Sequence, residues 1–148
     1  GQTLVSGGGD GLITLWPLYT SEPPLTLTGN LSSICSLAIS LDGEIVAAGC
    51  IDGNLKLWHL GTAALCNILP CYSGPVMSAL FNLEGRTLIG CSAGDTIKIW
   101  QIPTGELLGV LNTDSPSSVT SVTISPNGQW IAAGSEDGSV KIWGIGNW

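Results

Sequence analysis

Basic residues are scarce in this sequence. Lys and Arg together number four against 11 Asp and Glu, which leaves a net charge of −7 over 148 residues. The four cations occur singly, without a stripe or cluster, at Lys56, Arg86, Lys98 and Lys141. Binding to phosphate groups needs many clustered cations, so we expect no nucleic acid partner and no binding to an anionic membrane surface.

Long apolar runs and helical periods are also missing. The apolar stretches are interrupted every few residues, as between residues 34 and 51, where Asp42 and Glu44 intervene. We therefore expect no membrane span and no signal peptide. The hydrophobic share of 44% and the 21 glycines indicate a packed chain with many turns, which excludes intrinsic disorder.

Residues that ligate metals or form cross-links are few. There are five cysteines, an odd number without a C-x-x-C pair, and His59 is the only histidine. This usage favours reduced, buried thiols in an intracellular, cytoplasmic protein. A disulfide between Cys66 and Cys71 stays open as the alternative, because they are close in sequence. A single histidine cannot complete a zinc site or a Ser-His-Asp triad, so we expect no metal and no cofactor.

A repeat of about 42 residues runs through the chain. Tryptophan recurs at Trp16, Trp58, Trp100 and Trp143, at steps of 42, 42 and 43 residues. Within a repeat, short segments of alternating apolar residues end at Gly, Asp or Asn turns, as in 34–40, 44–50, 55–60 and 64–69. This pattern predicts four short antiparallel strands per repeat, named a, b, c and d in chain order, and no helix.

A four-stranded sheet of this size cannot bury both of its faces, so equivalent sheets are expected to stack. The segments 125–133 and 134–143 resemble the strand b, turn and strand c of the WD-repeat family. The resemblance covers the whole chain. It implies an all-β fold, a β-propeller of four-stranded antiparallel blades. The array is also similar to bacterial, including cyanobacterial, WD-repeat arrays that form the C-terminal half of signalling proteins.

The strand count predicts about three and a half blades. Blade 1 covers residues 1–28 without a strand a, blades 2 and 3 cover 29–70 and 71–112, and blade 4 covers 113–148 without a strand d. We therefore expect the chain to be the C-terminal part of a longer propeller, or to associate with a second copy into a closed ring.

The resemblance also implies which residues hold the blades together. The family's Trp-Asp dipeptide is absent, and its Gly-His pair before strand a is replaced, for example by Gly29 and Asn30 in blade 2. A turn aspartate six residues before the tryptophan is present in three repeats, and Gly94 takes its place in the third. We expect four equivalent buried tryptophans, three turn aspartates and one strand-b hydroxyl, namely Trp16, Trp58, Trp100, Trp143, Asp10, Asp52, Asp137 and Ser6.

A G-x-S-x-G pattern at residues 90–94 is typical of an acyl-transfer nucleophile, which would be Ser92. The same slot in the other repeats, at 7–11, 49–53 and 134–138, is an ordinary turn between strands b and c. The pattern also lacks the helix and the histidine base that this chemistry requires, so we expect no catalytic residue. The alternative is a propeller enzyme with carboxylates at the channel mouth, at Asp95, Asp114 and Glu136.

The resemblance implies a non-catalytic scaffold or docking module for a protein or peptide partner, within a larger signalling protein. In that family the d–a loops and b–c turns converge on one face of the ring and meet partners. The candidate contact residues at these positions are Asn30, Leu31, Ile51, Tyr72, Asp114, Ser115 and Glu136. We favour Tyr72 and Ile51, because an exposed aromatic or aliphatic side chain at a loop tip is a typical anchor. Local packing of both residues is the alternative.

Overall fold

The computed structural model describes residues 1–70, 74–114 and 116–145, and these residues form fourteen strands in four antiparallel sheets. Blade 1 consists of β1 (Thr3–Gly7), β2 (Ile13–Pro17) and β3 (Leu25–Leu27). Blade 2 consists of β4 (Ile34–Ile39), β5 (Ile45–Cys50), β6 (Asn54–His59) and β7 (Ala64–Pro70). Blade 3 consists of β8 (Val76–Phe81), β9 (Thr87–Ser92), β10 (Thr96–Gln101) and β11 (Leu107–Asn112). Blade 4 consists of β12 (Val119–Ile124), β13 (Trp130–Ser135) and β14 (Val140–Gly144).

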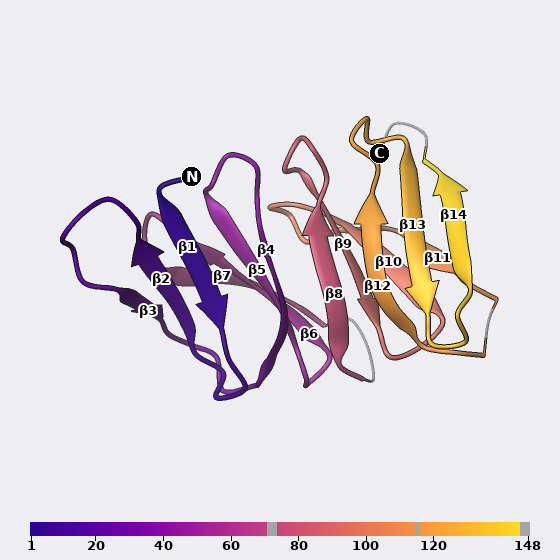
Figure 1. Ribbon diagram of the computed structural model, residues 1–148, viewed down its shortest axis with the longest axis horizontal. Coiled ribbons are helices and arrows are strands. Elements are labelled where there is room, and N and C mark those ends of the chain that lie inside the picture. Colours follow the sequence, from indigo (N-terminus) through magenta and orange to yellow (C-terminus); the bar gives the residue numbers. More distant parts are fainter. Residues whose placement is uncertain (71–73, 115, 146–148) are drawn as a thin grey trace.

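The four sheets stand side by side in chain order, with blade 1 and blade 4 at opposite ends of the row (Figure 1). Successive blades meet through their first strands, since β1 contacts β4, β4 contacts β8, and β8 contacts β12. The all-β fold of stacked blades predicted for a propeller is therefore confirmed. The described part of the chain contains no helix that could cross a membrane.

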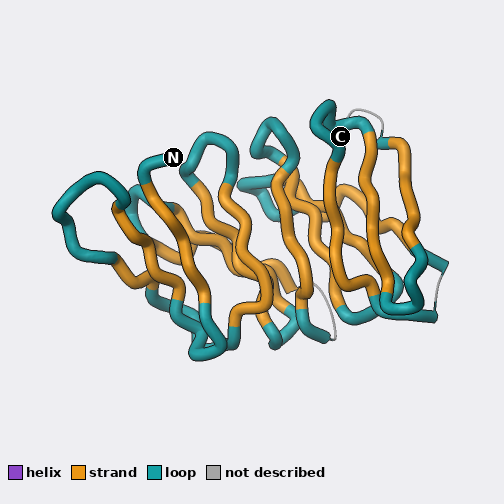
Figure 2. The backbone as a smooth tube through the Cα atoms, in the orientation of Figure 1, coloured by secondary structure: helices purple, strands orange, loops and turns teal. Residues whose placement is uncertain are grey.

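Connections between the strands gather at two opposite edges of the sheets (Figure 2). One edge carries the turns between strands b and c, at 8–12, 51–53, 93–95 and 136–139, and the described loop residues between blades, at 28–33, 113–114 and 116–118. We call it the loop edge. The other edge carries the a–b turns, such as 40–44, where Gly43 adopts a φ of 75° that a side chain would disfavour.

A β-bulge recurs at the start of the first strand in blades 2, 3 and 4. The pairing register shifts between Ile34 and Ser36, between Val76 and Ser78, and between Val119 and Ser121. A bulge leaves one extra residue unpaired, and in β4 that residue is Cys35, whose side chain is exposed. The prediction of buried thiols is therefore wrong for Cys35.

The described cysteines are all free, in two classes. Cys66 is exposed like Cys35, again in contrast to the prediction, whereas Cys50 and Cys91 are buried. Burial raises the pKa of the Cys50 and Cys91 thiols to about 11. Cys71, the proposed disulfide partner of Cys66, lies outside the described residues.

The hydrophobic core consists of three clusters, one at each junction between successive blades. Each strand-c tryptophan in blades 2 to 4 packs against the blade before it in the chain. Trp58 belongs to the cluster with Ile13 and Leu15 of blade 1, and Trp100 belongs to the cluster with Leu55 and Leu57 of blade 2. Burying a large apolar side chain of this kind contributes about 2 to 3 kcal/mol.

The four tryptophans are not equally buried, contrary to the prediction. Trp58 and Trp100 are 0% and 4% exposed, whereas Trp143 is half-buried and Trp16 is 42% exposed. The physical reason is that Trp16 and Trp143 belong to blades 1 and 4, which lie at the two ends of the row of sheets (Figure 1). No described sheet covers the face of blade 1 that carries Trp16, and no described strand pairs with the outer edge of β14 beside Trp143.

Candidate functional site

Hydrogen bonds fix the loop edge where blades 1 and 2 meet. The backbone N–H of Ile34 donates to the carbonyl of Gly8 over 3.1 Å, and the hydroxyl of Ser33 donates to the carbonyl of Gly9 over 2.6 Å. The N–H of Ile51 donates to the carbonyl of Ser33 over 3.0 Å. Two turns and the loop between the blades are thus held as one unit, because their backbone polar groups satisfy one another.

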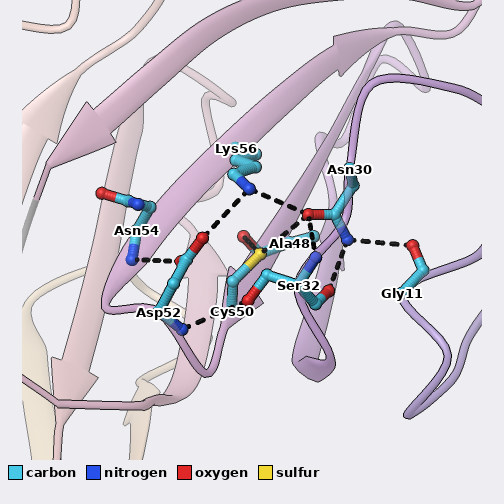
Figure 3. Close-up of polar contacts among 8 residues, drawn as sticks. All are labelled: Gly11, Asn30, Ser32, Ala48, Cys50, Asp52, Asn54 and Lys56. Atoms are coloured by element: carbon cyan, nitrogen blue, oxygen red, sulfur yellow. Dashed lines mark hydrogen bonds and ion pairs between the residues drawn. The ribbon is translucent and has the colours of Figure 1, made fainter.

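Asn30 lies at the centre of this unit (Figure 3). Its side-chain amide donates to the carbonyl of Gly11 over 2.9 Å and to that of Ser32 over 2.6 Å. Its Oδ1 accepts from the backbone N–H of Ser32 at 3.2 Å and from Nζ of Lys56 at 2.9 Å. The thiol of Cys50 is a weaker donor to the same oxygen, with Sγ at 3.8 Å.

Lys56 extends the network to the b–c turn of blade 2. Its Nζ lies 3.1 Å from Oδ2 of Asp52, and the lysine is buried at 8% exposure. Burial by itself would raise the pKa of Asp52. The hydrogen bonds from the Asn54 backbone and from Lys56 outweigh this effect, so the pKa of Asp52 lies below its usual value.

The structure corrects the role that was predicted for Asn30. It was expected at a partner contact, but its side chain is only 9% exposed and turns inward to Lys56 and Gly11. A buried amide that makes four good hydrogen bonds is a structural residue, because losing any of them inside the protein is costly.

Other predicted contact residues do lie on the surface of the loop edge. Leu31 is fully exposed at 101%, and Ile51 is 54% exposed. Glu136 is exposed in the b–c turn of blade 4. Asp114 is exposed and forms an ion pair with Lys141, with 2.9 Å between Oδ2 and Nζ. Tyr72 and Ser115 lie outside the described residues.

The turn aspartates share one hydrogen-bonding pattern. Oδ1 of Asp10, Asp52 and Asp137 accepts the backbone N–H two residues ahead, from Leu12, Asn54 and Ser139, over 3.1, 3.0 and 2.8 Å. In blade 1 the indole N–H of Trp16 donates to the hydroxyl of Ser6 over 2.8 Å. In blade 2 the indole of Trp58 instead donates over 2.8 Å to the carbonyl of Thr28, at the end of blade 1.

Two features of the loop edge were missed in the sequence. Leu12 is 50% exposed in the first b–c turn and adds a third apolar side chain beside the loops of Leu31 and Ile51. The lysines occur singly along the sequence, but Lys56, Lys98 and Lys141 all stand two residues before a strand-c tryptophan. Applying the repeat period to charged residues, and not only to apolar ones, would have found them.

The residues weighed for catalysis occupy ordinary positions in the sheets. Ser92 is 3% exposed at the end of β9, where its backbone pairs with Val76, and no helix follows it among the described residues. His59 ends β6, and its Nδ1 is buried without a hydrogen-bond partner. Within the described ranges, no three His, Cys, Asp or Glu side chains are grouped so that they could hold a metal ion.

Comparison with known proteins identifies the repeat. The family model described as "WD domain, G-beta repeat" matches residues 21–59, 64–101 and 105–144. A 27-residue segment is 59% identical to a protein of Dictyostelium discoideum named "Ribosome biogenesis protein BOP1 homolog", covering 18% of this chain and 3% of that protein. The family matches span most of the described strands and keep the blade-length step of the tryptophans. This chain therefore belongs to the WD40 repeat family.

Proposed function

We propose that this chain is a scaffold module that binds a protein or peptide partner on its loop edge. The observation that carries the proposal is the exposure of Leu12, Leu31 and Ile51 on three neighbouring loops. Apolar side chains on a fixed backbone are effective anchors, because little conformational freedom is lost when a partner covers them. The WD40 repeat match supports the same non-catalytic role.

The charges of the loop edge indicate the chemistry of the partner. Exposed carboxylates follow the loop edge, with Asp10 and Asp52 in the same turns as Leu12 and Ile51, and with Asp95, Asp114, Glu136 and Asp137 farther along in blades 3 and 4. The lysines Lys56 and Lys141 on this edge are already paired with Asp52 and Asp114. We therefore infer a partner segment that presents an apolar side chain flanked by Lys or Arg, since complementary charge favours association and orients the partner.

A second proposal concerns the larger protein to which the module belongs. We propose that it is the docking part of a larger signalling protein, whose catalytic work is done by another domain. The 27-residue match to the ribosome biogenesis protein is shorter than one repeat of 42 residues, so it supports the repeat fold and carries no partner over to this chain. A propeller enzyme is less well supported, since the Asp114 carboxylate is already ion-paired with Lys141.

Selection from a phage-displayed random peptide library tests the proposal. We expect peptides with basic residues next to an apolar one, and we expect the Leu31→Ala/Ile51→Ala double variant to bind them roughly tenfold more weakly or worse. Leu41→Ala is the matched control, because Leu41 is 76% exposed on the opposite edge. Fluorescence polarisation gives the dissociation constants. Equal affinity of the double variant and the control would contradict the proposal.

A further inference from the structure

The edge opposite the loop edge carries a groove between blades 3 and 4. The a–b turns of the two blades form its rim and lie side by side, since a Cβ atom on Gly128 would be 3.8 Å from Cδ1 of Leu83 (Figure 1). The groove has a volume of about 420 Å³, which is within the range of ligand clefts. Both of its walls belong to described blades that face each other, so it does not depend on the outer faces of blades 1 and 4.

The groove is apolar at its base and polar at its rim. Isoleucine side chains form the base, namely Ile89, Ile99, Ile124, Ile131 and Ile145. The rim carries the amide side chains of Asn82, Asn127 and Gln129, and Glu84 is the only charged residue among the described residues that line the groove. This lining fits a ligand with a narrow apolar body and one positive charge at its end.

In the a–b turns of blades 2 and 4, the residue at the position of Glu84 closes the turn. Oδ1 of Asp42 accepts a hydrogen bond from the hydroxyl of Ser40 over 2.5 Å. Oδ1 of Asn127 accepts one from the hydroxyl of Ser125 over 2.6 Å. Each of these oxygens also accepts the backbone N–H two residues ahead, over 3.0 and 3.1 Å. The side chain at this position is therefore occupied within its own turn in both blades.

Blade 3 closes the same turn without Glu84. Asn82 stands where the other two blades have serine, and its Oδ1 accepts the backbone N–H groups of Arg86 and Thr87, both over 3.0 Å. Among the described residues the carboxylate of Glu84 has no hydrogen bond and no ion pair, and Glu84 is exposed. The one charge on the rim of the groove is therefore available to a ligand.

The space in the groove follows from two small side chains. Ile124 is the last residue of β12, and the last residue of the equivalent strand β8 is Phe81, which packs against the core cluster between blades 2 and 3. Thr87 begins β9, and the larger Ile45 begins the equivalent strand β5. Larger side chains thus fill this position between blades 2 and 3, whereas the groove is left between blades 3 and 4.

We propose that this groove binds an arginine side chain of a partner protein. The methylene groups of the arginine lie on the isoleucine base, and its guanidinium group pairs with the carboxylate of Glu84. Arginine fits better than lysine, because its planar guanidinium group can donate two parallel hydrogen bonds to one carboxylate. The net charge of −7 also favours the approach of a cationic segment. This site is separate from the loop edge, on the opposite side of the blades.

Nuclear magnetic resonance of the isotope-labelled 148-residue chain tests the proposal. The probe is acetyl-arginine methylamide, which represents one arginine residue of a partner. We expect it to shift the backbone amides of Glu84, Thr87 and Gln129 with a dissociation constant of about 1 to 10 mM. The citrulline analogue has nearly the same shape without the charge, and it should bind at least about fivefold more weakly. The lysine analogue should also bind more weakly than the arginine probe.

Two substitutions separate the charge of the groove from its space. Glu84→Gln removes the charge and keeps the size of the side chain, and it should weaken binding of the arginine probe about fivefold or more. Ile124→Phe introduces the side chain that blade 3 has at the equivalent position, and it should abolish the shifts by filling the groove. Glu44→Gln is the matched control, because it removes an exposed carboxylate from the a–b turn of blade 2 and should leave binding unchanged.

The proposal would be overturned by equal affinity for the arginine and citrulline probes, or by equal affinity of Glu84→Gln and Glu44→Gln for the arginine probe. Equal binding of the lysine analogue would contradict recognition of the guanidinium group. Shifts confined to loop-edge residues such as Leu31 and Ile51 would place the arginine elsewhere and would also refute the site. The Leu31→Ala/Ile51→Ala double variant should bind the probe unchanged, so failure of this site and failure of the loop-edge proposal are distinguishable.

Discussion

The ammonium group of Lys56 lies 2.9 Å from Oδ1 of Asn30, a residue 26 positions earlier in the chain. This contact joins strand β6 to the loop between blades 1 and 2, and through the Asn30 amide it reaches the carbonyl of Gly11 in blade 1. The Gly-His pair that the family carries before strand a is replaced here by Gly29 and Asn30. The replacement residues in fact form a network of their own, with an amide and an ammonium group as its central members.

The first prediction concerns the effect of removing the Asn30 side chain on the stability of the fold. Asn30→Ala should lower the free energy of unfolding by about 2 to 4 kcal/mol, because it leaves the buried ammonium of Lys56 with Asp52 as its remaining partner among the described residues and removes the side-chain donor to the carbonyl of Gly11. Leu31→Ala is the adjacent control and should change stability by less than about 0.5 kcal/mol, since that side chain is fully exposed. Urea unfolding followed by tryptophan fluorescence gives both values. Equal losses of unfolding free energy for Asn30→Ala and Leu31→Ala would show that the hydrogen bonds of Asn30 contribute little to stability.

The lowered pKa of Asp52 predicts a defined dependence on pH. A carboxyl group whose pKa is lower in the folded state stabilises the fold above its unfolded pKa of about 3.9, and this stabilisation is lost as the pH falls through the folded pKa. Asp52→Asn should therefore be less stable than the unsubstituted chain at neutral pH. The difference should shrink below about pH 4. Unfolding curves across this range measure it, and a difference that stays constant with pH would contradict the assignment.

The arrangement of strands could be predicted from the sequence because its signals are local. Alternating apolar residues, Asp-Gly turns and the 42-residue step each involve residues a few positions apart or one repeat apart. The pairing of Lys56 with Asn30 could not be predicted from the sequence, because it depends on how a loop folds over the end of a strand. The exposure of Trp16 depends on whether another sheet covers its face. The exposure of Cys35 depends on a bulge that leaves no mark in the apolar pattern.

Thiol reactivity should separate the cysteines into two classes. Cys35 is exposed and should react first with a thiol reagent, and Cys66 should follow more slowly, because burial raises its pKa and its thiol donates to the carbonyl of Leu57 over 3.3 Å. Cys50 and Cys91 should react only when the chain unfolds, since both are buried with pKa values of about 11. Labelling of a Cys71→Ser variant, read by mass spectrometry of peptides, reports these four sites alone. Rapid labelling of Cys50 in folded protein would contradict the packing of blade 2.

Two glycines at equivalent positions of strand b give the sharpest test of the junctions between blades. A Cβ atom on Gly49 would overlap the hydroxyl of Ser36 in the same blade, and it would lie 2.7 Å from the carbonyl oxygen and 2.9 Å from Cγ1 of Val76 in blade 3. A Cβ atom on Gly134 would meet only the hydroxyl of Ser121, at 3.2 Å, because no described blade follows blade 4. The backbone of Val76 cannot rotate away, whereas the hydroxyl of Ser121 can.

Gly49→Ala should therefore cost about 2 to 3 kcal/mol of stability, as overpacking at a close contact does, and Gly134→Ala should cost less than about 1 kcal/mol. Both substitutions should be compared at one low protein concentration, with light scattering to show that the two variants have the same mass. Denaturant unfolding then reports the junctions within one chain alone. Similar costs at the two positions would mean that blades 2 and 3 do not approach as closely as the distance from Gly49 to Val76 requires.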